Sequence, residues 1–171
     1  MRQQNSKPAI ISANGCGCLV LLMCIGVMTA IALPSFLTMA TKAKQSEAIQ
    51  YVSSMNKGQQ AFYAEKSALS NSIKSAFSNS IPNLGLGIET ETINYKYSTH
   101  TTKQAVFNYG ISKHQTIASY VGGVFVVPDK NGSILTSILC EADDRGTIEP
   151  AKPIYQNGKV ICGQGTTEVT K

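Results

Sequence analysis

The feature that most constrains this chain is a long uncharged stretch near its N-terminus. No Asp, Glu, Lys or Arg occurs from Pro8 to Thr41, and Gly15 to Leu33 is almost wholly apolar. As an α-helix this run of about 19 residues would be about 29 Å long, close to the roughly 30 Å hydrocarbon core of a bilayer. Because lipid offers no hydrogen bonds, a helix is the only single-pass solution. We therefore expect a transmembrane helix over residues 15–40.

A cleavable secretory signal is the alternative reading of the same stretch. Such a signal has an apolar core of about 7–15 residues and ends in a small-x-small site. Ala30-Ile31-Ala32 has that form. However, the residues from Pro34 to Met39 keep the segment largely apolar and lead into a helical pattern, which favours a retained anchor.

The charges beside the apolar stretch predict its orientation. Arg2 and Lys7 precede it, and positive residues stay on the cytoplasmic side. Lys42 and Lys44 oppose this bias, but Glu47 follows them closely. We expect residues 1–14 to be a basic cytoplasmic leader of a single-pass protein in the cytoplasmic membrane, with the C-terminal domain periplasmic or on the cell surface.

Residues 41–69 continue as an amphipathic helix. Four apolar residues and one glutamine recur at spacings of four, three, four and three, which is one stripe of a 3.6-residue period: Ala48, Val52, Met55, Gln59 and Phe62. Pro34 is the one break between anchor and stripe, and proline kinks a helix without necessarily ending it. We expect one long helix with a kink at Pro34.

Residues 70–171 have the pattern of an extracytoplasmic globular β domain. Four runs are β-rich, and Asn131-Gly132 between the last two is a hairpin signal: 92–98, 105–111, 118–127 and 133–140. The segment from Glu141 to Gly146 reads as a loop, and Lys159–Cys162 could add an edge contact. The predicted fold class is α+β, a long helix packed on a four-stranded antiparallel sheet.

The five cysteines fall into two groups. Cys16, Cys18 and Cys24 lie in the apolar stretch, where we interpret them as small packing residues. Cys140 and Cys162 lie in the outer domain, and an oxidising compartment favours a disulfide between them. It would close a loop worth on the order of 3 kcal/mol. Two free buried thiols remain the alternative.

The charge pattern does not favour nucleic acid as a partner. The net charge is +5, but the chain beyond Lys7 has 13 basic and 10 acidic side chains, and phosphate binding needs clustered Lys and Arg.

The residues that could carry chemistry show no pattern of a site. His100 and His114 are isolated, and Asp143-Asp144-Arg145 reads as a solvated turn. Leu84-Gly-Leu-Gly-Ile88 lacks the Lys-Ser/Thr of a phosphate loop. We expect no catalytic, cofactor-binding or metal site, and no enzyme.

Several segments in order carry a resemblance to a known family. Thr29-Ala-Ile-Ala-Leu-Pro-Ser-Phe-Leu37 at the end of an apolar helix looks like a type IV pilin. Five further segments narrow it to the cyanobacterial type IV pilin-like G/H family, which the chain resembles past Gly15: Lys42–Ala48, Leu84–Ile88, Tyr120–Phe125, Ile138–Glu141 and Gly165–Val169. The resemblance implies a helix that anchors the subunit and then packs inside a filament, an antiparallel sheet, and a C-terminal disulfide loop matching Cys140 and Cys162.

The leader departs from the pilin pattern. Pilins carry Gly-Phe-Thr-Leu-Ile-Glu and are cut after the glycine by prepilin peptidase. Aligned on Pro34, Ser12 stands at that glycine and Ala13 at the phenylalanine, while Gly17 replaces the glutamate. Cleavage after Gly15 or Gly17 would still leave no acidic partner for the amino terminus of a neighbouring subunit.

Two functions fit this sequence. The first is a minor pilin or pseudopilin, a structural subunit of a pilus or type II secretion-like assembly whose partners are membrane lipid and other pilin subunits. The second is an uncleaved, non-polymerising pilin-fold membrane protein that serves as a tethered interaction module.

Overall fold

The computed structural model describes residues 14–69, 77–130 and 132–170. Within the helix, the side chains of residues 14–16, 18, 29–37 and 69 lie outside the described part. The chain divides into two compact units, Met1–Ala40 and Thr41–Lys171, which are treated in turn.

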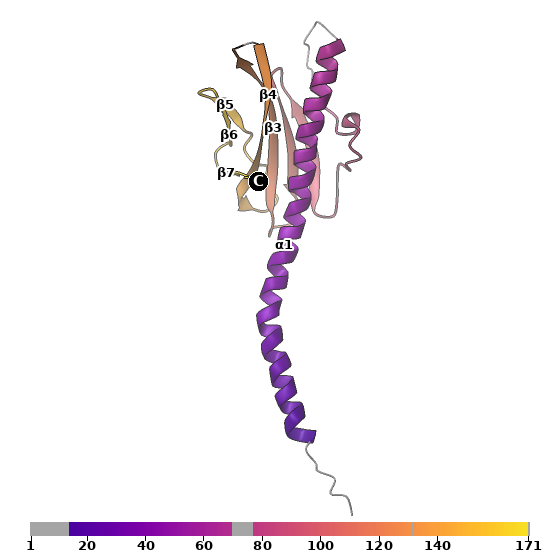
Figure 1. Ribbon diagram of the computed structural model, residues 1–171, viewed down its shortest axis with the longest axis vertical. Coiled ribbons are helices and arrows are strands. Elements are labelled where there is room, and N and C mark those ends of the chain that lie inside the picture. The colour runs from indigo at the N-terminus through magenta and orange to yellow at the C-terminus, as the bar shows by residue number, and fades with distance from the viewer. Residues whose placement is uncertain (1–13, 70–76, 131, 171) are drawn as a thin grey trace, which may run out of the picture. The chain divides into compact units, whose positions relative to one another are not determined.

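The first unit contains the beginning of the α-helix α1, which spans Asn14–Leu69 (Figure 1). Its described apolar side chains are solvent-exposed, Leu19 and Met23 among them. In the described parts of the chain, no helix combines the length and the hydropathy of a membrane span. The expected transmembrane helix over 15–40 includes residues 29–37, whose side chains lie outside the described part, and it stays a prediction from the sequence.

In the second unit, the stripe predicted on the helix is the face that packs on the sheet. Ala48, Val52, Met55 and Gln59 are fully buried, and Phe62 at the end of the stripe is half-buried. The charged side chains Lys57 and Lys66 are exposed. The 3.6-residue period therefore predicted the buried face of the helix correctly.

The sheet is antiparallel and has five strands in the order β1-β2-β3-β4-β7. The strands are β1 (Tyr95–Thr101), β2 (Ala105–Ser112), β3 (Ala118–Asp129), β4 (Gly132–Arg145) and β7 (Thr166–Glu168). The first four correspond to the predicted runs, and β3 and β4 form the predicted hairpin up to the Asp129–Gly132 pair. The predicted count of four strands is wrong, because β7 adds a short fifth.

Two further details differ from the sequence prediction. The strand expected to end at Cys140 continues to Arg145, because Glu141 and Ala142 pair with β7 and Arg145 pairs with Ala118. Lys159–Ile161 (β6) does not extend the large sheet. It pairs with Ile154–Gln156 (β5) in a separate hairpin, turned by Asn157 and Gly158, which both have positive φ.

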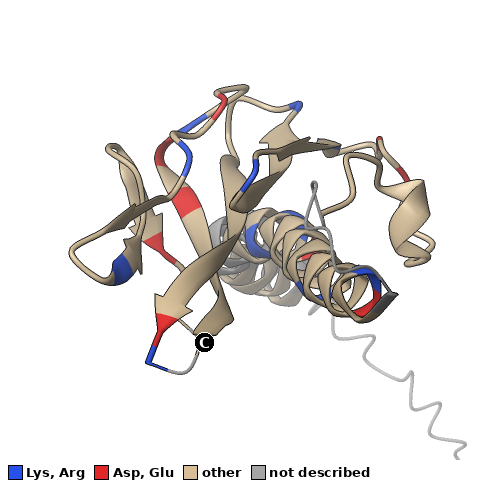
Figure 2. Cartoon of the chain, turned by 90° about the horizontal axis from the view of Figure 1, so that it is seen from above, with Lys and Arg blue, Asp and Glu red and all other residues tan. Residues whose placement is uncertain are grey.

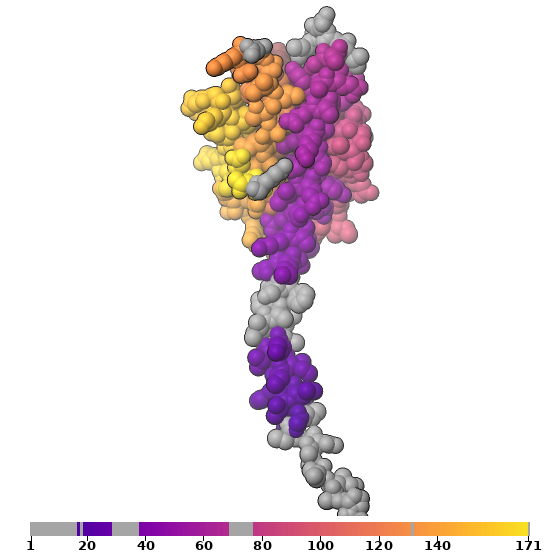
Figure 3. Space-filling model, in the orientation of Figure 1, coloured from indigo at the N-terminus to yellow at the C-terminus, as the bar shows by residue number. Residues whose placement is uncertain are grey.

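The two faces of the large sheet are covered by different parts of the chain. On one face Tyr95, Tyr97 and Tyr120 pack against α1. On the other, Phe107, Phe125 and Ile138 belong to a second cluster, against which Val160 and Cys162 of the C-terminal segment pack. The helix (purple) crosses one face in Figures 1 and 3, and the β5–β6 hairpin (yellow) lies beyond β4. Both faces are therefore buried, which fits the burial of every β2 residue except half-buried Ile111 and of β3 up to Phe125.

The segment between the helix and the sheet contains the predicted glycine turn. A short 3-10 helix, η1 (Pro82–Leu84), ends at Gly85, whose φ of 65° is left-handed. This turn packs closely on α1, since a Cβ at Gly58 would lie 2.8 Å from Cδ1 of Leu86. The turn therefore packs against the helix, and the expectation that it is no phosphate loop stays a prediction from the sequence.

Candidate functional site

A buried polar contact joins α1 to the middle of the sheet. Asn56 is 5% exposed, and its Nδ2 donates to the backbone oxygen of Ile138 at 3.0 Å. Its Oδ1 accepts from Nδ2 of Asn108 on β2 at 2.9 Å. Gly122 on β3 makes room for this amide, because a Cβ there would overlap it. One side chain of the helix thus connects to two strands and requires the absence of a side chain on a third.

The same network continues to the loop that follows the helix. The Gln59 amide donates to Ser78 O at 2.8 Å and accepts from Ser78 N at 2.9 Å. Its Nε2 also reaches Thr99 Oγ1 at 3.3 Å, and this hydroxyl donates to Asn108 Oδ1 at 2.9 Å. Buried amides that are satisfied in this way stabilise one helix position over others. The network fixes the register of α1 on the sheet.

A partly buried carboxylate lies one residue before Ala48, where the stripe begins. Glu47 accepts hydrogen bonds from Thr92 Oγ1 at 2.5 Å, Asn94 Nδ2 at 2.8 Å and the Tyr97 hydroxyl at 3.2 Å. Among the described residues no cation forms an ion pair with it. Burial, and then the charge of Glu47, raise the pKa of Tyr97 well above its ordinary value. The carboxylate thus holds the turn before β1 against α1.

Two other tyrosines complete this end of the interface. The Tyr95 hydroxyl donates to Ala118 O at 3.0 Å, while the Tyr120 hydroxyl accepts from Gln45 Nε2 at 2.9 Å. Burial is the main cause that raises the pKa of Tyr95 and of Tyr120. Both hydroxyls therefore have hydrogen-bond partners within the interface.

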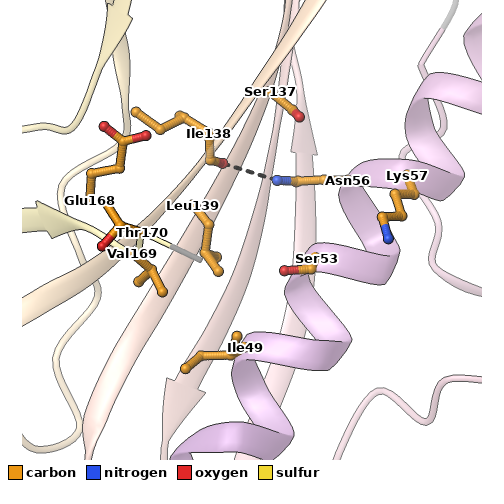
Figure 4. Close-up of a pocket in the computed structure, with 10 residues that line it drawn as sticks. All are labelled: Ile49, Ser53, Asn56, Lys57, Ser137, Ile138, Leu139, Glu168, Val169 and Thr170. Atoms are coloured by element: carbon orange, nitrogen blue, oxygen red, sulfur yellow. Dashed lines mark hydrogen bonds between the residues drawn. The ribbon is translucent and has the colours of Figure 1, made fainter.

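A groove opens between α1 and the edge of the sheet formed by β4 and β7 (Figure 4). Its volume is about 420 Å³, and Asn56 reaches across it to β4. The lining is mixed, with apolar, hydroxyl and charged side chains from three elements: Ile49, Ser53, Asn56, Lys57, Ser137, Ile138, Leu139, Glu168, Val169 and Thr170. The charged members of the lining are Lys57 from α1 and Glu168 from β7.

The predicted disulfide between Cys140 and Cys162 is present, with Cα atoms 5.8 Å apart. It joins β4 to the residue that follows the β5–β6 hairpin, and so closes the C-terminal segment over the second face of the sheet. The alternative of two free buried thiols is wrong. Of the three cysteines in the apolar stretch, Cys24 is free and exposed, while the side chains of Cys16 and Cys18 lie outside the described part.

The predicted leader and kink residues are not tested by the structure. Ser12 and Ala13 precede the described residues. Gly15 and Gly17 lie in the first turn of α1, and Pro34 lies within α1 with its side chain outside the described part. Cleavage near these positions and a kink at Pro34 stay predictions from the sequence.

Two of the residues considered for chemistry make contacts within the fold. His100 packs edge-on against Tyr109, and Asp143 accepts a hydrogen bond from Thr167 at 2.6 Å on the surface. Within the described ranges no three His, Cys, Asp or Glu side chains gather to hold a metal ion. Figure 2 shows basic and acidic residues interspersed along the chain.

The sequence prediction missed most of the polar interface. Asn56 and Asn108 were not singled out, because a polar residue gives no periodic signal of its own. Gln59 was placed on the buried stripe, and a glutamine among apolar residues at helical spacing is the one signal that pointed to a satisfied amide here. From the sequence, Glu47 enters only as an acidic residue close to Lys42 and Lys44.

Comparison with known proteins agrees with the resemblance seen in the sequence. Residues 45–163 match the family described as type IV pilin-like G and H, so the match covers the second half of α1, β1 to β6 and both bridged cysteines. No curated protein and no solved structure matches the sequence significantly. With more than half of the chain matched, this protein belongs to the type IV pilin-like G and H family.

Proposed function

We propose that this protein is a membrane-anchored structural subunit, a minor pilin or pseudopilin of a pilus or a type II secretion-like assembly. The observation that carries the proposal is the family match, which covers a helix packed on an antiparallel sheet. The stretch from Pro8 to Thr41, which contains no charged residue, supports the anchor. Its role is structural: the helix packs against other helices, and the outer domain is exposed on the assembly. We propose no reaction, cofactor or metal. Its partners are lipid and other pilin-like subunits.

The apolar side chains of the first unit support the anchoring role. Leu19, Leu22 and Met28 are at least 60% exposed, as is Met23. Apolar surface of this extent marks contact with a bilayer or with other helices. We place the N-terminus in the cytoplasm and the second unit outside the cytoplasmic membrane, because Arg2 and Lys7 precede the apolar stretch.

A specific residue favours a second role for the same fold. Gly17 stands where the pilin pattern has its glutamate, so no carboxylate would meet the amino terminus of a neighbouring subunit in an apolar filament core. A chain that keeps its leader would be a tethered interaction module, and prepilin peptidase would not act on it.

Two measurements separate these roles. Filaments sheared from cells and probed for this chain should contain it if it is a subunit, and should lack it if it is a tethered module. The intact mass of the membrane-extracted protein reports the leader: loss of the first 12 to 17 residues supports processing. A chain of full length that is absent from sheared filaments would overturn the subunit role.

A further inference from the structure

One side of β4 is open over half of the strand. β4 pairs with β3 along its length from Gly132 to Arg145, but it pairs with β7 only at Cys140–Ala142. Val169 N extends the β7 contact by one hydrogen bond, to Leu139 O at 2.9 Å. From Ser133 to Ser137 no described strand lies on that side.

The backbone groups on this open side can be assigned from the register. Alternate residues of an antiparallel strand point both N–H and C=O toward the same neighbour. Leu139 O points toward β7, and the pairing of β3 with β4 is regular from Tyr120 to Asp129. The peptide groups of Ser133, Leu135 and Ser137 therefore face outward, and in the described structure no backbone group bonds to them on that side.

The open segment also lacks the features by which proteins block strand edges. Exposed edges are usually protected by charged residues, proline, a bulge or a covering loop. Within the described residues Ser133-Ile-Leu-Thr-Ser137 has none of them, and Ile134 is 50% exposed. The outer edge of β1 differs, because Tyr97 N donates to Thr90 O at 2.7 Å and Glu91 forms a bridge with Lys96.

We propose that this edge of β4 pairs with the same edge of a second copy of the chain. Antiparallel pairing about Leu135 places Ser133 opposite Ser137 of the second copy, so the uncharged segment is complementary to itself. The three outward-facing residues of each copy would form about six backbone hydrogen bonds. The free length, from the turn at Gly132 to the β7 contact at Leu139, is the length that such a pairing needs.

The groove of Figure 4 leaves space beside this edge. Ser137 and Leu139 line it from β4, and Ile49 and Ser53 line it from α1. Side chains of the second strand that point to the helix side of the sheet would enter its 420 Å³. On the opposite side of the sheet, side chains of the second strand would partly bury Ile134, which is exposed in the single chain.

This pairing rests on the fold and not on the proposed function. A contact between identical edges has two-fold symmetry and closes on itself, so it produces a dimer, whereas a filament needs head-to-tail contacts. The dimer would therefore be a state of the unassembled chain, and its absence would leave the filament role untouched.

Cysteine cross-linking tests the pairing directly. The background is the full-length protein with Cys16, Cys18 and Cys24 changed to Ala. One variant carries Ser133→Cys, and the other carries Ser137→Cys and a tag that distinguishes the two on a gel. On oxidation in detergent, a mixture of the two should give the disulfide-linked heterodimer, and each variant alone should give little. The β1 variant Ser98→Cys is the matched control. Cross-linking of Ser98→Cys to the same extent, or no heterodimer in the mixture, would overturn the proposal.

A charge at the edge provides a second test. Light scattering of the full-length protein in detergent should give a dimer mass for the unaltered chain and for Ser98→Lys, and a monomer mass for Ser137→Lys. Ser137 is exposed, so the substitution leaves the core of the sheet intact. Persistence of the dimer in Ser137→Lys, or a monomer mass for the unaltered chain, would contradict pairing through β4.

Discussion

At the scale of single residues, the interface between helix and sheet depends on a few polar side chains in an apolar setting. Asn56 and Gln59 lie on the buried face of α1, and each amide is satisfied by the sheet or by the following loop. Because an unsatisfied buried amide is costly, these contacts favour one position of the helix. Apolar packing alone would allow small shifts along the helix axis.

Asn56→Ala should lower the free energy of unfolding by about 1–3 kcal/mol, because it leaves Asn108 Nδ2 without its partner and removes the bond to Ile138 O. Urea unfolding of the full-length protein in detergent measures the change. Gln50→Ala is the matched control, since Gln50 is an exposed helix residue, and its effect should stay within about 0.5 kcal/mol. Equal losses for both variants would show that the buried amide has no special role.

The tyrosines beside Glu47 predict a stability loss at alkaline pH. Burial raises the pKa of Tyr97, Tyr95 and Tyr120 above the value near 10 of an unfolded chain. At high pH the folded state therefore binds more protons than the unfolded state. Their contribution to stability is complete below about pH 10 and is lost as pH rises toward the folded-state pKa.

Tyr97→Phe should reduce this loss, because it removes one of the three phenols with raised pKa. Unfolding free energies at pH 8 and at about pH 11 provide the measurement, and the difference between them should be smaller in Tyr97→Phe than in the unaltered protein. Tyr155→Phe on the exposed β5–β6 hairpin is the control and should leave the difference unchanged. A pH dependence unaffected by Tyr97→Phe would refute the assignment.

At the scale of elements, the sequence predicted those parts of the fold that have a periodic signal. The stripe from Ala48 to Phe62 predicted the packing face of α1, and alternation with Asn-Gly predicted the β3–β4 hairpin. β7 was missed because three residues at a strand edge have too few positions for alternation to show. β4 was predicted too short because Glu141, Asp143 and Asp144 are charged, although a strand near an edge can hold them.

The site was less predictable than the fold. Cys140 and Cys162 could be paired from the sequence, because two thiols in an outer domain have few alternatives. The contacts of Asn56 with Ile138 and Asn108 join residues far apart in the chain, and they depend on the exact position of the helix on the sheet. No local pattern contains that information.

Removal of the disulfide by Cys140→Ser should destabilise the second unit by about 3 kcal/mol. The reason is that the cross-link between residues 22 apart in sequence no longer lowers the conformational entropy of the unfolded chain. Unfolding in detergent and migration on non-reducing gels both report it. Cys24→Ser, which changes a free exposed thiol, should alter neither. The same gel shift in both variants would argue against the Cys140–Cys162 bond.

At the scale of the whole molecule, the chain joins an uncharged helical segment to a unit with two covered sheet faces. The family match runs from residue 45 to residue 163, so it covers most of the packed unit and none of the uncharged segment. The role of the first 40 residues therefore rests on their sequence and on their exposed apolar side chains. We propose that this segment remains part of the working protein, embedded in a bilayer or among other helices.

Alkaline carbonate extraction followed by N-terminal sequencing of the recovered protein tests that claim most directly. We predict that the protein stays in the pelleted membranes or filaments and that its sequence includes the apolar residues from Leu19 to Leu33. Recovery from the supernatant of a chain that begins near Leu33 would contradict the account, because the apolar segment would then be a discarded export signal.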